Sequence, residues 1–136
     1  MQLDPTAFIA DAELIEALVK RATPIVCDSD RVLFRQGDHP VGLYILQSGQ
    51  ALLSMTAAEG EPILLFETGP GSLLGLPGVV SDQPFTLTAI ARAGAEVNFI
   101  SREQFKAFMQ TYPLLAFKIL QVLAAEVSAA RRAIVR

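Results

Sequence analysis

The residues that could carry catalysis are few and scattered along the chain. His39 is the one histidine and Cys27 the one cysteine, so a Ser–His or Cys–His pair would have to use one of them. His39 lies in the turn QGDHPVG, which favours a solvated side chain, and Cys27 ends the strand-like TPIVC, which favours a small core residue. Asp38 and Glu67 could be paired acids, but their spacing does not bring them together and both suit surface turns. We therefore expect no catalytic residue, no metal site and no enzyme.

Residues 71–89, GSLLGLPGVVSDQPFTLTA, have the form of a binding loop without its usual charges. Glycine turns lie between two strand-like runs, as in a segment that holds a ligand by its backbone. The segment contains no Arg, Lys, His or Glu, and Asp82 is its one charge. A buried anion needs a positive charge or several donors, and Pro77 removes one backbone donor. The loop therefore lacks an ionic partner for an anionic ligand.

Composition indicates one globular domain over residues 1–136. Hydrophobic residues make up 51% of the chain and charged residues 18%, which excludes disorder. The net charge is −3, with +3 on residues 112–136 and −6 on the rest, so we expect no direct binding to nucleic acid. We see no signal peptide and no apolar run long enough to cross a bilayer, so we expect no membrane association. A single cysteine excludes an internal disulfide, and a cytoplasmic location is the default expectation.

The pattern of helices, strands and turns predicts a mostly β fold. A helix is predicted over residues 11–21, a β-roll over 23–101 and C-terminal helices over 102–136. Within the roll, Ser48-Gly49 is a hairpin-type signal, and Gly94 separates the last two strands. The expected class is an antiparallel β-roll, or jelly roll, with flanking helices and a long C-terminal helix. The expected strands are 31–34, 42–47, 50–55, 63–67, 86–93 and 95–101.

The C-terminal region predicts a short helix followed by a long one. Ser101 and Gln104 fit a capping box, and Pro113 fits the first turn of the final helix. That helix carries two apolar rows, and one is a heptad seam that we expect to form a homodimer. One broad buried stripe within a monomer is the alternative. The seam residues are Ala116, Leu120, Leu123, Val127, Ala130 and Ile134; the second row is Leu115, Ile119 and Val122.

The order of elements resembles a known family. The segments LFRQGDHPVGLYILQSGQALLSM, PGSLLGLPGVV and AEVNFISREQFKAFMQTYP are similar to the cyclic-nucleotide-binding sensory domain of catabolite-activator and fumarate-nitrate-reductase-type transcriptional regulators. The resemblance covers residues from about 11 to the end. It implies a phosphate-binding cassette over 71–89 and a dimerising final helix. It also implies that a DNA-binding domain would follow, and we expect none within this chain.

The cassette departs from the family pattern at the positions that hold the nucleotide. The family places Gly-Glu near the cassette start, where Glu receives the ribose hydroxyl, and Arg-Ser or Arg-Thr near its end, where Arg pairs with the phosphate. Here Gly75 is followed by Leu76, and Phe85 precedes Thr86. The final-helix positions that contact the base in the family match Ala130 and Arg131.

These departures predict a sensory or regulatory module with a degenerate cassette, acting in signal transduction or transcriptional regulation. We predict no cofactor and an unidentified small-molecule effector, and conventional cyclic AMP binding is doubtful. Leu73, Leu74, Leu76, Val79, Val80 and Phe85 are expected to fill the former ligand cavity. The residues of any remaining pocket are Gly75, Leu76, Pro77, Gly78, Phe85, Thr86, Thr88 and Arg131. Two alternatives stay open: a cyclic AMP or cyclic GMP domain with unconventional contacts, and an interaction module with no ligand.

Overall fold

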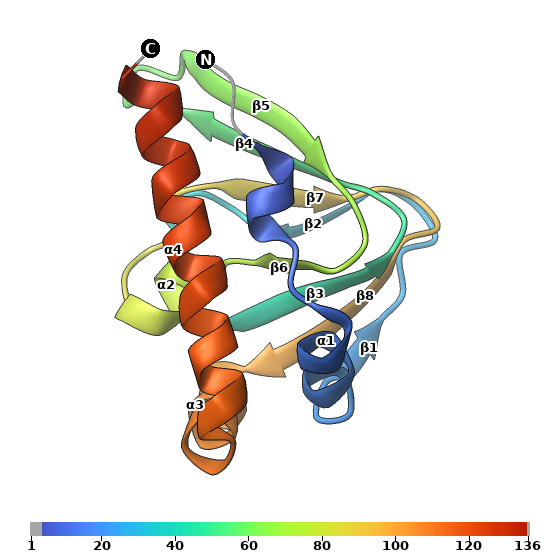
Figure 1. Ribbon diagram of the computed structural model, residues 1–136. Helices are drawn as coiled ribbons and strands as arrows, with labels where there is room; N and C mark the ends of the chain where they lie inside the picture. Colours follow the sequence, from blue (N-terminus) through green and yellow to red (C-terminus); the bar gives the residue numbers. More distant parts are fainter. Residues whose placement is uncertain (1–3, 136) are drawn as a thin grey trace.

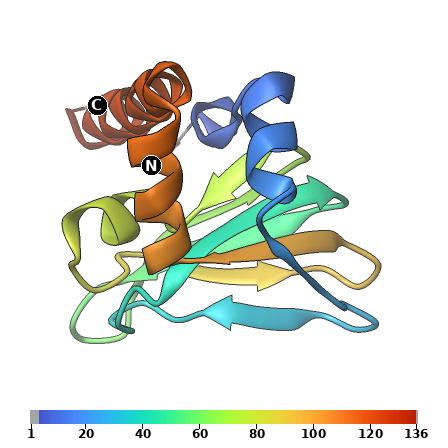
Figure 2. The same ribbon diagram turned by 90° about the horizontal axis from the view of Figure 1, so that it is seen from below.

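The computed structural model describes the backbone of residues 4–135 and the side chains of residues 4–132. Eight strands form two four-stranded antiparallel sheets, and the helices gather on one side of them (Figures 1 and 2). The mostly β roll with a long C-terminal helix is therefore confirmed. The elements are η1 (Pro5–Phe8), α1 (Ala12–Val19), β1 (Thr23–Ile25), β2 (Arg31–Phe34), β3 (Gly42–Ser48), β4 (Ala51–Thr56), β5 (Pro62–Thr68), β6 (Ser72–Leu74), α2 (Leu76–Ser81), β7 (Thr88–Ala91), β8 (Glu96–Ser101), α3 (Arg102–Thr111) and α4 (Pro113–Val135).

The chain changes sheet at every strand connection except the one from β4 to β5, and two of these crossings are the glycine turns at Gly49 and Gly94. One sheet has the order β1-β8-β3-β6 and the other β2-β7-β4-β5, so β3 and β4 do not pair. The hairpin expected at Ser48-Gly49 is therefore wrong: the turn is present, but it connects the two sheets. A Cβ on Gly49 would lie 2.8 Å from the Cα of Ala95, beside the crossing at Gly94. The two turns meet too closely for a side chain at Gly49, whose φ is also +85°.

The helical regions follow their predicted signals with two additions. Asp11 caps α1 by accepting from the Leu14 N–H at 2.9 Å, and Ser101 with Gln104 forms the capping box of α3. The final helix begins at Pro113, as predicted. The additions are the 3₁₀ turn η1, capped by Asp4, and the short helix α2, which lies inside the segment expected to be a loop.

The two apolar rows of α4 have different surroundings. The row of Leu115, Ile119 and Val122 faces the roll, with Ile119 and Val122 buried and Leu115 packed against the core. Figure 1 shows α4 running along the roll beside η1 and α2. The other row leaves large apolar side chains exposed on the described chain. Leu120 and Val127 of the predicted seam are exposed, and so are Leu114 and Phe117, which lie outside that row.

Residues Pro113–Arg132 of α4 also have the length and mean hydropathy, 1.5, of a membrane-spanning helix. The expectation that no run reaches this length is wrong by that measure. Length and composition alone are weak evidence for a membrane span, because a core helix of a soluble protein passes the same test. Here 22% of the segment is buried, on the face that packs against the roll.

Candidate functional site

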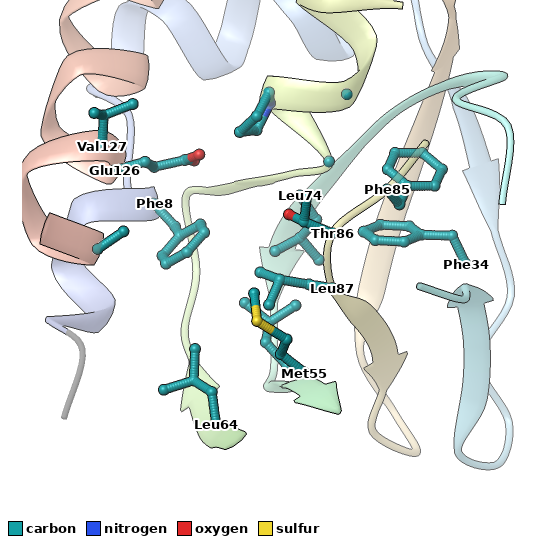
Figure 3. Close-up of a pocket in the computed structure, with 15 residues that line it drawn as sticks. Phe8, Phe34, Met55, Leu64, Leu74, Phe85, Thr86, Leu87, Glu126 and Val127 are labelled. Atoms are coloured by element: carbon teal, nitrogen blue, oxygen red, sulfur yellow. The ribbon is translucent and has the colours of Figure 1, made fainter. Parts of the chain in front are cut away.

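A cavity of about 170 Å³ lies between α4, η1, α2 and the β-roll (Figure 3). This volume is close to that of an engineered cavity of about 150 Å³ that binds benzene, and below the roughly 300–1,000 Å³ of ordinary small-molecule sites. The cavity can therefore hold a molecule about the size of one ring. It is lined by Phe8, Phe34, Leu53, Met55, Leu64, Leu74, Gly75, Pro77, Gly78, Phe85, Thr86, Leu87, Glu126, Val127 and Ala130.

The cassette wall of the cavity, residues 75–86, begins at a glycine that no other residue could replace without strain. Gly75 has a φ of +91° and is the N-cap of α2. A Cβ at this position would lie 2.6 Å from the ring of Phe85. Gly78 is similarly constrained, because its Cβ would lie 2.9 Å from the Gln83 carbonyl oxygen. The glycine turn is thus closed around an aromatic ring.

Phe85 is a core residue. Its side chain is 3% exposed and stacks on Phe34, with ring centroids 4.0 Å apart. Its N–H donates to the Asp38 carbonyl at 3.0 Å, and its carbonyl accepts from the Gly37 N–H at 2.7 Å. Both backbone bonds fix the ring against the turn between β2 and β3. The side chain at the family's arginine position is thereby held in apolar surroundings.

The structure brings together only part of the predicted pocket. Gly75, Pro77, Gly78, Phe85 and Thr86 line the cavity. Three other predicted members are not among its lining residues. Leu76 is fully buried in the core, Arg131 is exposed on α4, and the Thr88 hydroxyl accepts from the Gln36 N–H at 2.9 Å.

The expected filling of the cavity is incomplete. Leu73, Leu74, Leu76, Val79 and Phe85 are buried as expected, but Val80 is 38% exposed and does not contribute. The short helix α2 explains this difference, because residues on one helical turn face different sides. The five buried residues leave the described cavity open beside α4.

The helix wall of the cavity, formed by α4, contributes Glu126, which sequence reasoning missed. Its side chain is 6% exposed, and its Oε1 has no hydrogen-bond partner in the part of the chain that the structure describes. Figure 3 shows its carboxyl directed from α4 into the space beside Leu74 and Thr86. Burial raises the pKa of this carboxyl to about 8. The buried row continues from Ile119 and Val122 at helical spacing, and this periodicity could have identified Glu126 as an acid on a core face.

The other candidate chemical groups are separated from this cavity. Asp38 accepts from the Arg35 N–H, and Glu67 pairs with Arg92 at 2.7 Å, so each has its own partner. His39 is exposed. Cys27 is buried as a core residue, and burial raises the pKa of its thiol. Among the described residues, no three His, Cys, Asp or Glu side chains are grouped to hold a metal ion.

Curated relatives share segments of this chain within much longer proteins. The acetyltransferase Pat of Mycolicibacterium smegmatis is 32% identical over 77 residues, which cover 57% of this chain and 23% of that protein. The neuropathy target esterase sws of Drosophila melanogaster is 26% identical over 122 residues, which cover 82% of this chain and 9% of that protein. This chain thus spans less than a quarter of either relative.

Solved structures share the fold over almost the whole chain. The catabolite activator protein of Thermus thermophilus has a TM-score of 0.79 at 24% identity, covering 96% of this chain and 62% of that one. Reduced CprK without ligand has a TM-score of 0.77 at 18% identity, covering 94% and 60%. The c-di-GMP-responsive regulator CLP of Xanthomonas campestris has a TM-score of 0.72 at 22% identity, covering 90% and 63%. The matching fold is that of the sensory domains of these regulators.

A family model identifies the segment responsible for this similarity. The model of the cyclic nucleotide-binding domain matches residues 25–112, which run from the end of β1 through the cassette to the end of α3. This match spans more than half of the sequence and contains both sheets apart from the first residues of β1. The chain belongs to the cyclic nucleotide-binding domain family.

Proposed function

We propose that the chain is a regulatory effector-binding module with a degenerate phosphate-binding cassette, acting in signal transduction or transcriptional regulation. One observation carries the proposal: Leu76 and Phe85, at the positions of the family's ribose-binding Glu and phosphate-binding Arg, are both buried in the core. Similar solved structures include a transcriptional regulator from Thermotoga maritima and the c-di-GMP-responsive regulator CLP, which supports a regulatory role for this fold.

The charge distribution around the cavity supports loss of the conventional nucleotide contacts. None of the described lining residues is basic. Arg102, on α3, donates its Nε–H to the Val79 carbonyl at 2.9 Å and lies 3.7 Å from Asp82, so its guanidinium is engaged outside the lining. A phosphodiester moved into this cavity would lose its hydration without gaining an ion pair, which carries a cost of several kcal/mol.

The outer row of α4 supports dimerisation with a second copy of this chain. Leu114 is 84% exposed, Phe117 61%, Leu120 50% and Val127 45%. Leu120 and Val127 lie on the predicted seam, and exposed large apolar side chains of this kind often mark an interface. Within the predicted seam, Leu120 and Val127 are exposed, Ala116, Leu123 and Ala130 are partly buried, and the Ile134 side chain lies outside the described residues.

The same helix connects the cavity to the proposed dimer. Val127 and Ala130 line the cavity and also belong to the predicted seam. An effector with different affinities for two positions of α4 would shift the population between them. We propose that this shift is the output of the module.

Isothermal titration calorimetry with cyclic AMP, cyclic GMP and cyclic dinucleotides tests the loss of nucleotide binding. We expect no binding heat at micromolar concentrations, because the cavity is small and lacks a basic lining residue. Micromolar binding of any of them would instead assign a cyclic-nucleotide domain with unconventional contacts.

Sedimentation equilibrium tests the dimer separately. We expect a monomer–dimer equilibrium that shifts with protein concentration. A chain that stays monomeric at high micromolar concentration, combined with no response to any ligand, would leave an interaction module without an effector.

A further inference from the structure

Glu126 is a buried acid that the described residues do not satisfy. It follows Ile119 and Val122 on the buried row of α4 and precedes the buried Ala129. Its Oε1 is buried and unpaired within the described chain. Native proteins contain few such groups, and a buried carboxylate without a partner is costly. The position therefore calls for an explanation beyond packing, since an aliphatic residue would fill it at lower cost.

The cations on the same helix do not satisfy this carboxyl. Lys118 lies 2.7 Å from Asp11 and 3.0 Å from Glu13, so it connects α4 to α1. Arg131 and Arg132 are exposed at the other end of the described helix. Among the described residues no cation pairs with Glu126, and its carboxyl points into the cavity, where a ligand could supply the partner.

The lining of the cavity determines which chemistry such a partner needs. Phe8, Phe34 and Phe85 contribute aromatic rings to the lining, and Thr86 adds a hydroxyl. Of the described lining residues, Glu126 alone is ionisable. An anion would meet an acid and no base, whereas a cation would gain an ion pair and aromatic neighbours. The volume of about 170 Å³ restricts the apolar part to about one ring.

We infer that the cavity binds a small apolar amine, with its ammonium group at the Glu126 carboxylate and its apolar body among the aromatic rings. This inference deepens the proposed function and rests on it, because it names the chemical class of the effector. In the empty cavity the carboxyl is mostly protonated at neutral pH, since burial raises its pKa to about 8. Binding of an ammonium ion releases that proton to the solvent, and the ion pair then holds the carboxylate.

Benzylamine, benzyl alcohol and toluene form a matched series for the test, because they share one ring and differ in the polar group. Calorimetry and thermal shift would compare the natural chain with Glu126→Gln, and with Glu103→Gln, the same change at an exposed acid on α3. We expect benzylamine to bind the natural chain and the Glu103 variant equally. We expect at least tenfold weaker benzylamine binding to Glu126→Gln, with toluene binding unchanged.

Two further measurements keep the test informative if Glu126→Gln folds poorly. The ¹³C shift of the Glu126 carboxyl, followed against pH in the natural chain, should report a lower pKa when benzylamine is present. Ala130→Leu, which adds bulk to the lining but leaves the carboxyl unchanged, should weaken all three ligands together.

The outcomes separate this inference from the proposed function. If benzylamine binds no better than toluene, or binds Glu126→Gln equally well, the amine assignment is overturned while an effector module of other specificity stands. If a broad metabolite panel also produces no binding and the chain stays monomeric, the proposed function fails as well.

Discussion

The cassette wall and the helix wall of the cavity have opposite chemistry. On the cassette wall, the Phe85 ring packs against Gly75 and Leu76 is buried. The two positions that contact the nucleotide in the family are therefore occupied here by core residues. On the helix wall, Glu126 places an unpaired carboxyl in the same cavity. A site can thus lose the groups for one ligand and still carry a costly polar group.

Removing the ring of the cassette wall should have the largest effect on stability. We expect Phe85→Ala to lower the free energy of unfolding by about 3–5 kcal/mol, because it deletes a buried ring stacked on Phe34. Urea denaturation measures this loss. Leu65→Ala, at a residue exposed on β5, is the control and should change stability by about 0.5 kcal/mol or less. Equal losses in the two variants would show that Phe85 is not a core residue.

Replacing the acid of the helix wall should stabilise the protein at alkaline pH. Burial raises the Glu126 pKa from 4.5 to about 8, so the folded state binds a proton more tightly than the unfolded state does. The stability of the natural chain therefore falls as pH rises from about 4.5 to about 8. We expect Glu126→Leu to remove this decline and to gain about 2–4 kcal/mol at pH 9 over the natural chain.

Unfolding curves of both proteins at pH 4 and pH 9 measure the difference. At pH 4 the two should be closer in stability, because the carboxyl is protonated in both the folded and unfolded chains. A natural chain whose stability does not fall between these pH values relative to Glu126→Leu would show that the carboxyl has a partner.

The contact between Gly75 and Phe85 predicts an energetic coupling within the cassette wall. Gly75→Ala should cost about 1–3 kcal/mol, from the positive φ and from the clash with the ring. Gly37→Ala is a matched control, because Gly37 has a φ of +92° with no atom within 4 Å of the added Cβ. In a double-mutant cycle, Gly75→Ala should cost less stability when it is combined with Phe85→Ala, because the ring with which the added Cβ clashes is then absent. Additive losses in the two variants would argue against the contact.

The outer row of α4 predicts a smaller effect that depends on concentration. Leu120→Ser should weaken the dimer at least tenfold, or about 1.4 kcal/mol, by removing an exposed apolar side chain from the seam. Sedimentation equilibrium measures this change, and Leu65→Ser, on an exposed face of β5, is the control. Unchanged dimerisation would place the interface elsewhere.

The sequence predicted features set by local patterns and missed those set by packing. The capping box at Ser101 and the start at Pro113 depend on neighbouring residues, and both are found as expected. The sheet crossing at Ser48-Gly49 depends on how distant strands pair, and a two-residue turn signal does not contain that information. Similarly, α2 forms within a glycine- and proline-containing segment of low helix propensity, where tertiary packing decides.

The candidate site shows the same division. Five predicted pocket residues line the cavity because the cassette is contiguous in sequence, whereas Leu76 within the same stretch is turned into the core. Thr88 and Arg131 do not line the cavity, because their positions depend on the register of β7 and on the rotation of α4. Glu126 was visible as an acid on a buried helical face, but its lack of a partner could be recognised only from the fold.

A ¹H–¹⁵N NMR titration with cyclic AMP reports on the cassette residue by residue, and so shows whether the nucleotide enters it. If the cassette wall has become core, the amide signals of Gly75, Gly78 and Thr86 should stay in place up to millimolar nucleotide. Saturable shifts of these signals at micromolar cyclic AMP would contradict the account, since the phosphate would then have found a partner among residues that the structure places in an apolar wall.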